Sequence, residues 1–444
     1  MERSITQKVS AVLSEDGFSL DELIIRTKEL FDSEGIAGFV SLLLELVDAH
    51  LCWRLIHQRP GWQPKPCCEQ PDYELQNRVA RRIRTSIGVI HLSWRRLRCR
   101  CCGRSLLPLR EFVGLCRYQS KSNELAKIVI EVVSEQNYRR ATRHLDTIGL
   151  IPVPKSTAHR WVATSDCDEI PAVTQSLPSL LVDGTGYKRR PDPPAGIDNQ
   201  GEVRIALGID DHGTVIPLGA WTDKTWEEIG QALSPAQPQG TLRHGVLVSD
   251  GEPGLAEGLA QLVNHQQRCQ WHQVHDLDYQ MYRDSAPVRY RRERQRELAG
   301  IIGIELPATD FKVVPDADKA ALAQATDQAE QEVLGLIDKL VTKGYHHAAE
   351  YVRNAKDRLF TYIRVWLACG LVTPRVSSLL ERMMREIGRR LKRIAFGWSE
   401  RGAAQMTRII IKRFTSADQW NAYWNAKLRI TGRVTLTLQS TTAV

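Results

Sequence analysis

The chain has 444 residues, of which 42% are hydrophobic and 25% charged, which is the composition of a globular protein with two to four domains. Lysine and arginine exceed aspartate and glutamate by 60 − 52 = 8, a balance that permits a polyanionic partner without requiring one. We expect no membrane span and no secretion, because runs such as Phe39–Val47 are too short to cross a bilayer and the first residues lack a signal-peptide core.

Residues 1–60 carry apolar side chains at helical spacing, which predicts a helical N-terminal region. Residues 61–118 form a different module. Two strand-like runs, Val79–Thr85 and Val89–Leu97, are joined at Ser86–Gly88 and predict a β-hairpin.

Cysteines flank this hairpin. Five of the ten cysteines fall in two short clusters, which in a chain without a signal peptide favours a metal over disulfides. Cys99 and Cys102 have the spacing of a zinc knuckle, and Cys67 and Cys68 could supply the other pair. Because adjacent cysteines rarely bind one ion together, the fourth ligand stays open, with Cys101 as the spare; an unmetallated, reduced cluster is the alternative.

Residues 119–166 predict a helix-turn-helix DNA-binding domain. Its last two helices are expected at Tyr138–Leu145 and Ser156–Val162, with Ser156 as the N-cap of the second. An ordinary helical hairpin with a basic face is the alternative. The residues expected to face a major groove are Lys155, Ser156, His159 and Arg160, and those expected to meet phosphates are Arg139, Arg140 and Arg143.

After a polar linker at Ser165–Pro178, the pattern changes to that of a mixed α/β layer. Buried strands at Leu180–Asp183 and Gly245–Asp250 each end in an aspartate that is followed by glycine. Two more strands, Glu202–Ile209 and Val215–Trp221, flank a predicted hairpin turn, Asp210–Gly213.

The two strand-end aspartates are candidate metal ligands. Carboxylates at the carboxyl ends of neighbouring inner strands face the crevice where α/β sheets bind ligands, and their oxygens suit Mg²⁺. Holding two ions for phosphoryl transfer needs a third carboxylate, and the candidate is Glu381 on the basic helix Ser377–Arg393. Asp-Gly pairs are also common in turns, and Glu386 is the rival of Glu381, although it is better placed to pair with arginines of its own helix.

Three stretches give a resemblance to a known family: Asp183–Gly186, Ser249–His272 and Leu380–Arg390. They resemble the Mutator-like bacterial insertion-sequence transposases, members of the DDE superfamily, in which a Cys-x-x-His signature follows the second aspartate by about twenty residues. Here Cys269 lies 269 − 250 = 19 residues after Asp250, and His272 follows at the right offset. Departures at Tyr187–Pro191 and Met383-Met384 leave the subgroup open.

The resemblance implies an RNase H-like core at residues 179–274 and 371–415, interrupted by an all-helical insertion at 275–370 and followed by a C-terminal tail at 416–444. Asp183, Asp250 and Glu381 would hold two Mg²⁺ or Mn²⁺ ions. Cys269 and His272 would support the core rather than bind zinc, because structural zinc needs four ligands and neither His265 nor His275 has convincing spacing.

The sequence therefore predicts a multidomain α+β protein that is a DNA transposase. Its expected partners are terminal inverted repeats and target DNA, contacted also by Arg382, Arg385 and Arg389, and a second copy of the chain in a dimer or higher assembly. We expect a prokaryotic, cytoplasmic, nucleoid-associated protein without a membrane partner. The alternatives are an RNase H-fold nuclease or resolvase that cuts without joining, and a zinc-containing transcription regulator with an inactive core.

Overall fold

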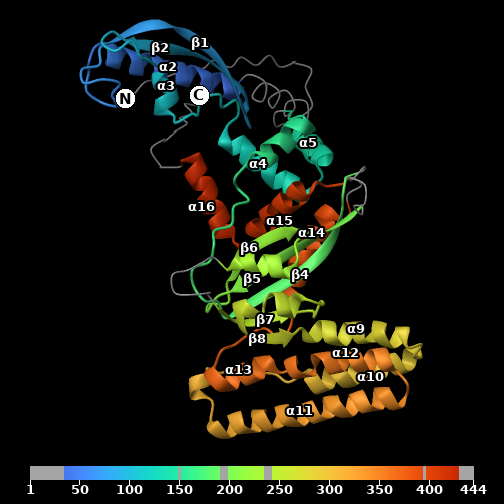
Figure 1. The fold of residues 1–444 in the computed structure, drawn as a ribbon. Helices are drawn as coiled ribbons and strands as arrows, with labels where there is room; N and C mark the ends of the chain where they lie inside the picture. Colours follow the sequence, from blue (N-terminus) through green and yellow to red (C-terminus); the bar gives the residue numbers. More distant parts are fainter. Residues whose placement is uncertain (1–34, 149–151, 191–198, 235–242, 394–396, 430–444) are drawn as a thin grey trace, which may run out of the picture. The chain divides into compact units, whose positions relative to one another are not determined.

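The computed structural model describes residues 35–148, 152–190, 199–234, 243–393 and 397–429. The chain divides into two compact units, one of Met1–Val162 with Lys427–Val444 and one of Ala163–Ala426 (Figure 1). Helices combine with two separate sheets, which agrees with the predicted α+β class. The predicted helices before residue 35 lie outside the described residues.

The first unit contains a small sheet covered by a helix. Strands β1 (Tyr73–Thr85), β2 (Gly88–Cys99) and β3 (Ser105–Leu106) follow one another in the sheet, each antiparallel to the next. Helix α2 (Ile36–Ile56) and the short α3 (Pro108–Phe112) cover it. The core between them is made of Leu51, Ile83, Ile90, Leu92, Trp94 and Leu109. The β-hairpin is thus present, with strands longer than the periodicity predicted.

Helix α2 has the length and hydropathy of a membrane span, with a mean hydropathy of 1.6, so the expectation that no apolar run is long enough was wrong for this segment. One helix of this length and hydropathy is weak evidence for a membrane-spanning segment. The helix carries a buried Asp48, whose carboxylate lies 3.0 Å from Nη1 of Arg95 on β2. Its buried Leu51 and Leu55 belong to the cores that pack against the hairpin.

Three helices complete the first unit: α4 (Asn123–Glu135), α5 (Tyr138–Thr147) and α6 (Lys155–Ala163). The side chain of Asn137 caps α5 by accepting a hydrogen bond from the backbone N–H of Arg140 at 2.8 Å. Helix α6 begins at Lys155, so Ser156 lies in its first turn and not at the predicted N-cap. Residues 149–151, between α5 and α6, lie outside the described residues.

The second unit is built on a five-stranded sheet. Its strands are β4 (Ser179–Lys188), β5 (Gln200–Ile209), β6 (Val215–Thr222), β7 (His244–Ser249) and β8 (Val263–Arg268). The order across the sheet is β6-β5-β4-β7-β8. Strands β4, β5 and β6 pair antiparallel, whereas β7 and β8 run parallel to β4. The predicted turn between β5 and β6 is present, because Oδ1 of Asp210 accepts hydrogen bonds from the N–H groups of His212 and Thr214.

Helices cover this sheet. The core beneath α7 (Trp226–Leu233) and α8 (Leu255–Gly258) includes Leu180, Val182, Trp226, Leu247 and Leu262. Helix α14 (Ser378–Leu391) packs on β4, and α15 (Glu400–Thr415) packs on β6. Helix α16 (Ala417–Leu428) follows, with Trp420 and Trp424 buried.

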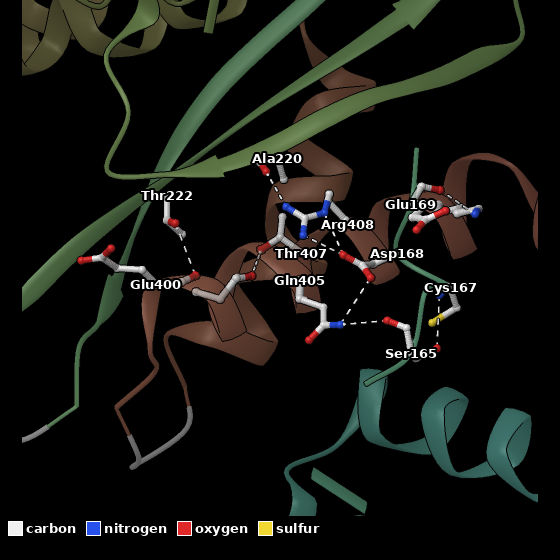
Figure 2. Close-up of polar contacts among 12 residues, drawn as sticks. Ser165, Cys167, Asp168, Glu169, Ala220, Thr222, Glu400, Gln405, Thr407 and Arg408 are labelled. Carbon is white, nitrogen blue, oxygen red and sulfur yellow. Dashed lines mark hydrogen bonds and ion pairs between the residues drawn. The ribbon is translucent and has the colours of Figure 1, made fainter. Parts of the chain in front are cut away.

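The segment before β4, predicted as a polar linker, is bound to α15 (Figure 2). Oδ2 of the buried Asp168 accepts hydrogen bonds from Nε and Nη2 of Arg408 at 3.0 and 2.6 Å. Nη1 of the same arginine donates to the carbonyl of Ala220 on β6 at 3.2 Å. Gln405 donates to the carbonyl of Ser165. The start of this segment is therefore part of the folded unit.

Between β8 and α14 lie five helices with a hydrophobic core of their own: α9 (Gln270–Arg283), α10 (Val288–Ile302), α11 (Asp316–Thr342), α12 (His346–Ala355) and α13 (Thr361–Cys369). Figure 1 shows them running side by side. Fully buried members of this core include Leu277, Leu298, Leu336, Val352 and Ile363. The helices begin at Gln270, five residues before the predicted insertion.

Candidate functional site

The two candidate aspartates lie at equal offsets on neighbouring parallel strands. The last paired residues of β4 and β7 are Leu181 and Val248. Asp183 lies two residues beyond the first of them and Asp250 two residues beyond the second, so the two carboxylates come together where the strands separate. The predicted end of the first strand was wrong, because β4 leaves β7 after Leu181 but continues to pair with β5 through Lys188.

The environment of Asp183 is electrically unfavourable for a carboxylate. Burial, the negative charge of Asp250 and that of Glu381 raise the pKa of Asp183 to about 7, against the hydrogen bond that its Oδ1 accepts from the N–H of Gly184 at 2.7 Å. The interaction of these three groups shows that the sequence-predicted carboxylates share one region. Like charges held in a half-buried place mark a site that a cation would stabilise.

Glu381 lies in the first turn of α14, the helix that packs on β4. Its Oε1 lies 3.1 Å from Nε2 of His272 on α9. The contact has ion-pair distance but not hydrogen-bond geometry, and this buried oxygen has no hydrogen-bond donor among the described residues. Burial alone would lower the pKa of His272, but the Cys269 thiol and the nearby carboxylates outweigh it and raise the pKa to about 9.

Cys269 joins the two elements that present Asp250 and Glu381. Its backbone N–H donates to the carbonyl of Ser249 at 2.8 Å, next to Asp250. Its fully buried Sγ lies 3.2 Å from Oγ of Ser377 and accepts from the N–H of that residue, at the start of α14. The Cys-x-x-His stretch therefore contacts both carboxylate-bearing elements, Cys269 by hydrogen bonds and His272 through Glu381.

One residue of this region, Arg268, had no role in the sequence analysis, and it lies against the glycine that follows Asp250. Gly251, directly after Asp250, has φ +82°, and a Cβ there would lie 1.2 Å from Nη1 of Arg268. The buried Arg268 is fixed by Oε1 of Gln273 at 3.0 Å and by the hydroxyl of Tyr351 at 2.8 Å. Glycine is needed at this position because the backbone is left-handed and because the Arg268 guanidinium leaves no room for a Cβ. Nothing in the local sequence announces this contact.

The rival glutamate behaves as its sequence position suggested. Glu386 pairs with Arg389 on the surface of α14, so one of the predicted DNA-contacting arginines is engaged within its own helix. The other two, Arg382 and Arg385, are exposed. His265 is exposed on β8, and Nδ1 of His275 contacts Asp276 at 2.8 Å. Within the described part of the chain, neither histidine joins Cys269 and His272 in a compact set of metal ligands.

The four cysteines of the first unit converge. Among the described residues, Cys67, Cys68, Cys99 and Cys102 are the one group of three or more His, Cys, Asp or Glu side chains whose ligand atoms all lie within 4.8 Å of one another. The carboxylate site is more widely spaced. Sγ of Cys68 lies 3.7 Å from that of Cys99 and 4.0 Å from that of Cys67, close to the separation of about 3.8 Å that tetrahedral zinc–sulfur bonds of about 2.3 Å require.

The thiols of this cluster are electrically unequal. Hydrogen bonding from the backbone of Cys102 lowers the pKa of Cys99 to about 6 although burial opposes it, whereas burial raises the pKa of Cys68. Cys101 is exposed and lies outside the group. The adjacent pair thus contributes both of its sulfurs, and the cluster can hold a metal ion.

The predicted DNA-contacting residues of α5 and α6 all lie at the surface. The exposed residues are Arg139, Arg140, Arg143, Lys155, Ser156, His159 and Arg160. Buried Ala141 and Leu145 on α5 and Ala158 and Trp161 on α6 form the opposite faces. Both helices therefore present basic side chains to solvent.

No family model matches the chain, and no curated protein matches it.

Proposed function

We propose that this chain is a DNA transposase of the DDE type, whose catalytic carboxylates are Asp183, Asp250 and Glu381. The observation that carries the proposal is the meeting of three carboxylates from β4, from the end of β7 and from the first turn of α14. Burial, together with the negative charges of Asp250 and Glu381, raises the pKa of Asp183 to about 7. A buried group of like charges destabilises the fold, and such groups are typical of functional sites.

Two further features support the proposal. The sheet order β6-β5-β4-β7-β8, with its first three strands in the chain antiparallel and its last two parallel to β4, fits the RNase H-like core that the resemblance implies. The helices α9 to α13 interrupt this core between Asp250 and Glu381, where the resemblance implies an insertion.

The chemistry of the donors suits divalent cations. Carboxylate oxygens are the ligands that Mg²⁺ and Mn²⁺ prefer, and the buried Oε1 of Glu381 has no donor in the part of the chain that the structure describes. Two bound ions would stabilise charge on the attacking and leaving oxygens of an in-line displacement at phosphorus. The chain's own residues would hold the ions, with His272 orienting Glu381, while Arg382 and Arg385 on the exposed face of α14 contact the DNA backbone.

The first unit would then recognise the DNA. Helix α6 would enter a major groove at the terminal repeats while the arginines of α5 contact phosphates, and the four cysteines would hold one structural Zn²⁺ that fixes the hairpin. Joining of two ends would require at least a dimer.

The test is cleavage of DNA that carries the terminal sequences flanking the gene. Asp183→Asn, Asp250→Asn and Glu381→Gln should each reduce Mg²⁺-dependent strand cleavage by at least about a thousandfold, a loss of about 4 kcal/mol of transition-state stabilisation, with little change in DNA affinity. Glu386→Gln, one turn further along the same helix, is the matched control and should retain cleavage. Full activity in any of the three variants would remove that residue from the triad.

The products separate the alternatives. A transposase joins the freed 3′ ends to a second DNA, whereas a nuclease or resolvase of the same fold releases cut ends without joining them to a target. A regulator with an inactive core would bind the DNA and cut nothing.

A further inference from the structure

The β-hairpin of the first unit is strongly cationic. Between Arg78 and Arg110 the sequence has ten arginines and no aspartate or glutamate. The strand register places Arg82 directly opposite His91, and Arg84 opposite Val89, on one face of the hairpin. Arg82, His91 and Arg84 are exposed. No described carboxylate lies within ion-pair distance of Arg82 or Arg84. Such clustering of like charge is unfavourable unless an anion is bound.

The turn end of this face is hydrogen-bonded to the segment that precedes α4. The N–H of Arg84 donates to the carbonyl of Ser120 at 3.0 Å, and the N–H of Ser122 donates to the carbonyl of Arg84 at 2.8 Å. Between them, Nζ of Lys121 lies 4.6 Å from the centre of the Trp161 ring on α6. Hairpin and α6 are therefore held in one geometry rather than joined by a free loop.

A cleft of about 500 Å³ lies at this junction. Its cationic and polar lining comes from both elements: Arg82, Arg84 and His91 from the hairpin, and Thr157 and Arg160 from α6, with Trp161 beside them. None of the described residues that line the cleft is acidic. Burial and the charge of Arg160 lower the pKa of the adjacent Lys121, as expected where positive charge accumulates.

Guanidinium groups bind phosphate oxygens through two parallel N–H donors. Three guanidiniums that surround one cleft, two on a strand and one on a helix, suit a polyanion that passes along the cleft better than one small ion. Arg160 also follows His159 on the helix that presents Lys155 and Ser156, so an anion in the cleft would lie beside the surface offered to a major groove.

We infer that the hairpin is a second DNA-binding element, and that the cleft between β1–β2 and α6 holds phosphates of the duplex backbone. This inference rests on the proposed function, because it takes duplex DNA as the partner. Arg82 and Arg84 would position the duplex against α6 and carry no sequence information themselves.

The experiment uses the full chain and a mixed-sequence DNA duplex of about 30 base pairs, with affinity measured by fluorescence anisotropy between about 50 and 200 mM salt. Arg82→Ala with Arg84→Ala should weaken binding by at least about tenfold. The same pair should reduce the slope of log affinity against log salt by about two, one for each lost phosphate contact.

The matched control removes the same charge elsewhere on the module. Arg98 and Arg104 are exposed, and Arg98 lies seven residues along β2 from His91, about 23 Å at strand spacing. Arg98→Ala with Arg104→Ala should leave the salt slope unchanged. Equal slopes for the wild type and the Arg82/Arg84 pair would overturn the inference. Tighter binding of an RNA duplex of equal length would also overturn it.

A third variant guards against misfolding. Arg82→Lys with Arg84→Lys keeps the charge but loses the two-donor geometry, so the salt slope should persist while affinity falls severalfold; unchanged affinity here contradicts the inference. The result is separable from the proposed function. If DNA binding depends on the cleft but no Mg²⁺-dependent cleavage occurs, the proposed transposase function is wrong and the inference about the cleft stands. If the protein cleaves DNA but its binding does not depend on the cleft, the inference is wrong and the proposed function stands.

Discussion

The cysteines around the hairpin and the carboxylates at the five-stranded sheet are two groups of candidate metal ligands, and they are arranged in different ways. The four sulfurs lie within 4.8 Å of one another, and Sγ of Cys67 lies 3.6 Å from the hydroxyl of Tyr73. The three carboxylates share a region but keep a wider spacing, and burial together with the charges of Asp250 and Glu381 raises the pKa of Asp183.

This difference separates a closed site from an open one. Four protein ligands complete the coordination of a structural zinc ion, whereas catalytic sites keep positions for water or substrate. A site with four protein ligands stabilises the fold, whereas a site with open positions and uncompensated negative charge is suited to catalysis. Three predictions test whether the two sites divide in this way.

The largest expected effect is on the closed site. Purified protein should carry about one tightly held zinc ion, and Cys99→Ser with Cys102→Ser should lose it, together with more than about 5 kcal/mol of the stability of the first unit. Metal analysis and thermal melting would measure both. Cys101→Ser, at the exposed neighbour outside the group, is the control and should keep the zinc. Wild-type protein purified without zinc would contradict a structural zinc site at these cysteines.

The next effect concerns the turn that presents Asp250. Gly251→Ala should destabilise the second unit by about 3 kcal/mol, because it adds left-handed strain and displaces the Arg268 guanidinium. Gly254→Ala is a close control, since Gly254 has φ +78° with nothing within 4 Å of a built Cβ; it should lose only the strain of about 1 kcal/mol. Denaturant unfolding would compare them, and equal losses would exclude a role for the guanidinium contact.

The smallest effect tests the unbalanced charge. A folded-state pKa of Asp183 near 7, raised from 3.8, means that metal-free protein loses stability as pH rises from about 4 to 7 through this group. At pH 7.5, Asp183→Asn should therefore be more stable than the wild type without Mg²⁺, by on the order of 1 kcal/mol. The gain should shrink toward pH 4 and reverse in sign when Mg²⁺ is added. Melting at both pH values would check this, and a destabilised variant without Mg²⁺ would contradict it.

The sequence predicted those parts of the fold that local patterns encode. Alternating polar and apolar residues located the hairpin, and the side-chain oxygen of Asp210 formed the expected turn. The true end of β4 was missed, because the sequence Asp183-Gly184 resembles a turn while the pairing with β5 that prolongs the strand is non-local. The start of α6 was misplaced for a smaller reason, since the helix begins directly after Pro154 and leaves no position for a side-chain cap at Ser156.

The sequence predicted the three carboxylates of the candidate site but not the residues that hold them in place. Asp183 and Asp250 stand out because each ends a buried strand, whereas the choice of Glu381 on its basic helix depends most on the resemblance. Arg268 could not be found in this way, because its contact with Gly251 exists only once β7 and β8 are side by side. The use of both Cys67 and Cys68 ran against the usual preference for spaced ligands and became visible only through the sulfur positions.

The helical insertion has a consequence for how the protein is made. Glu381 is synthesised 381 − 250 = 131 residues after Asp250, a delay on the order of 10 s on a ribosome. Helices α9 to α13 contain their own core and can fold in that interval. Helix α14 then adds the last carboxylate through Cys269, whose partner Ser377 is also late. If the chain acts as proposed, a nascent chain that has already folded its hairpin and α6 would bind DNA before the triad is complete, and the order of synthesis would separate binding from cutting in time.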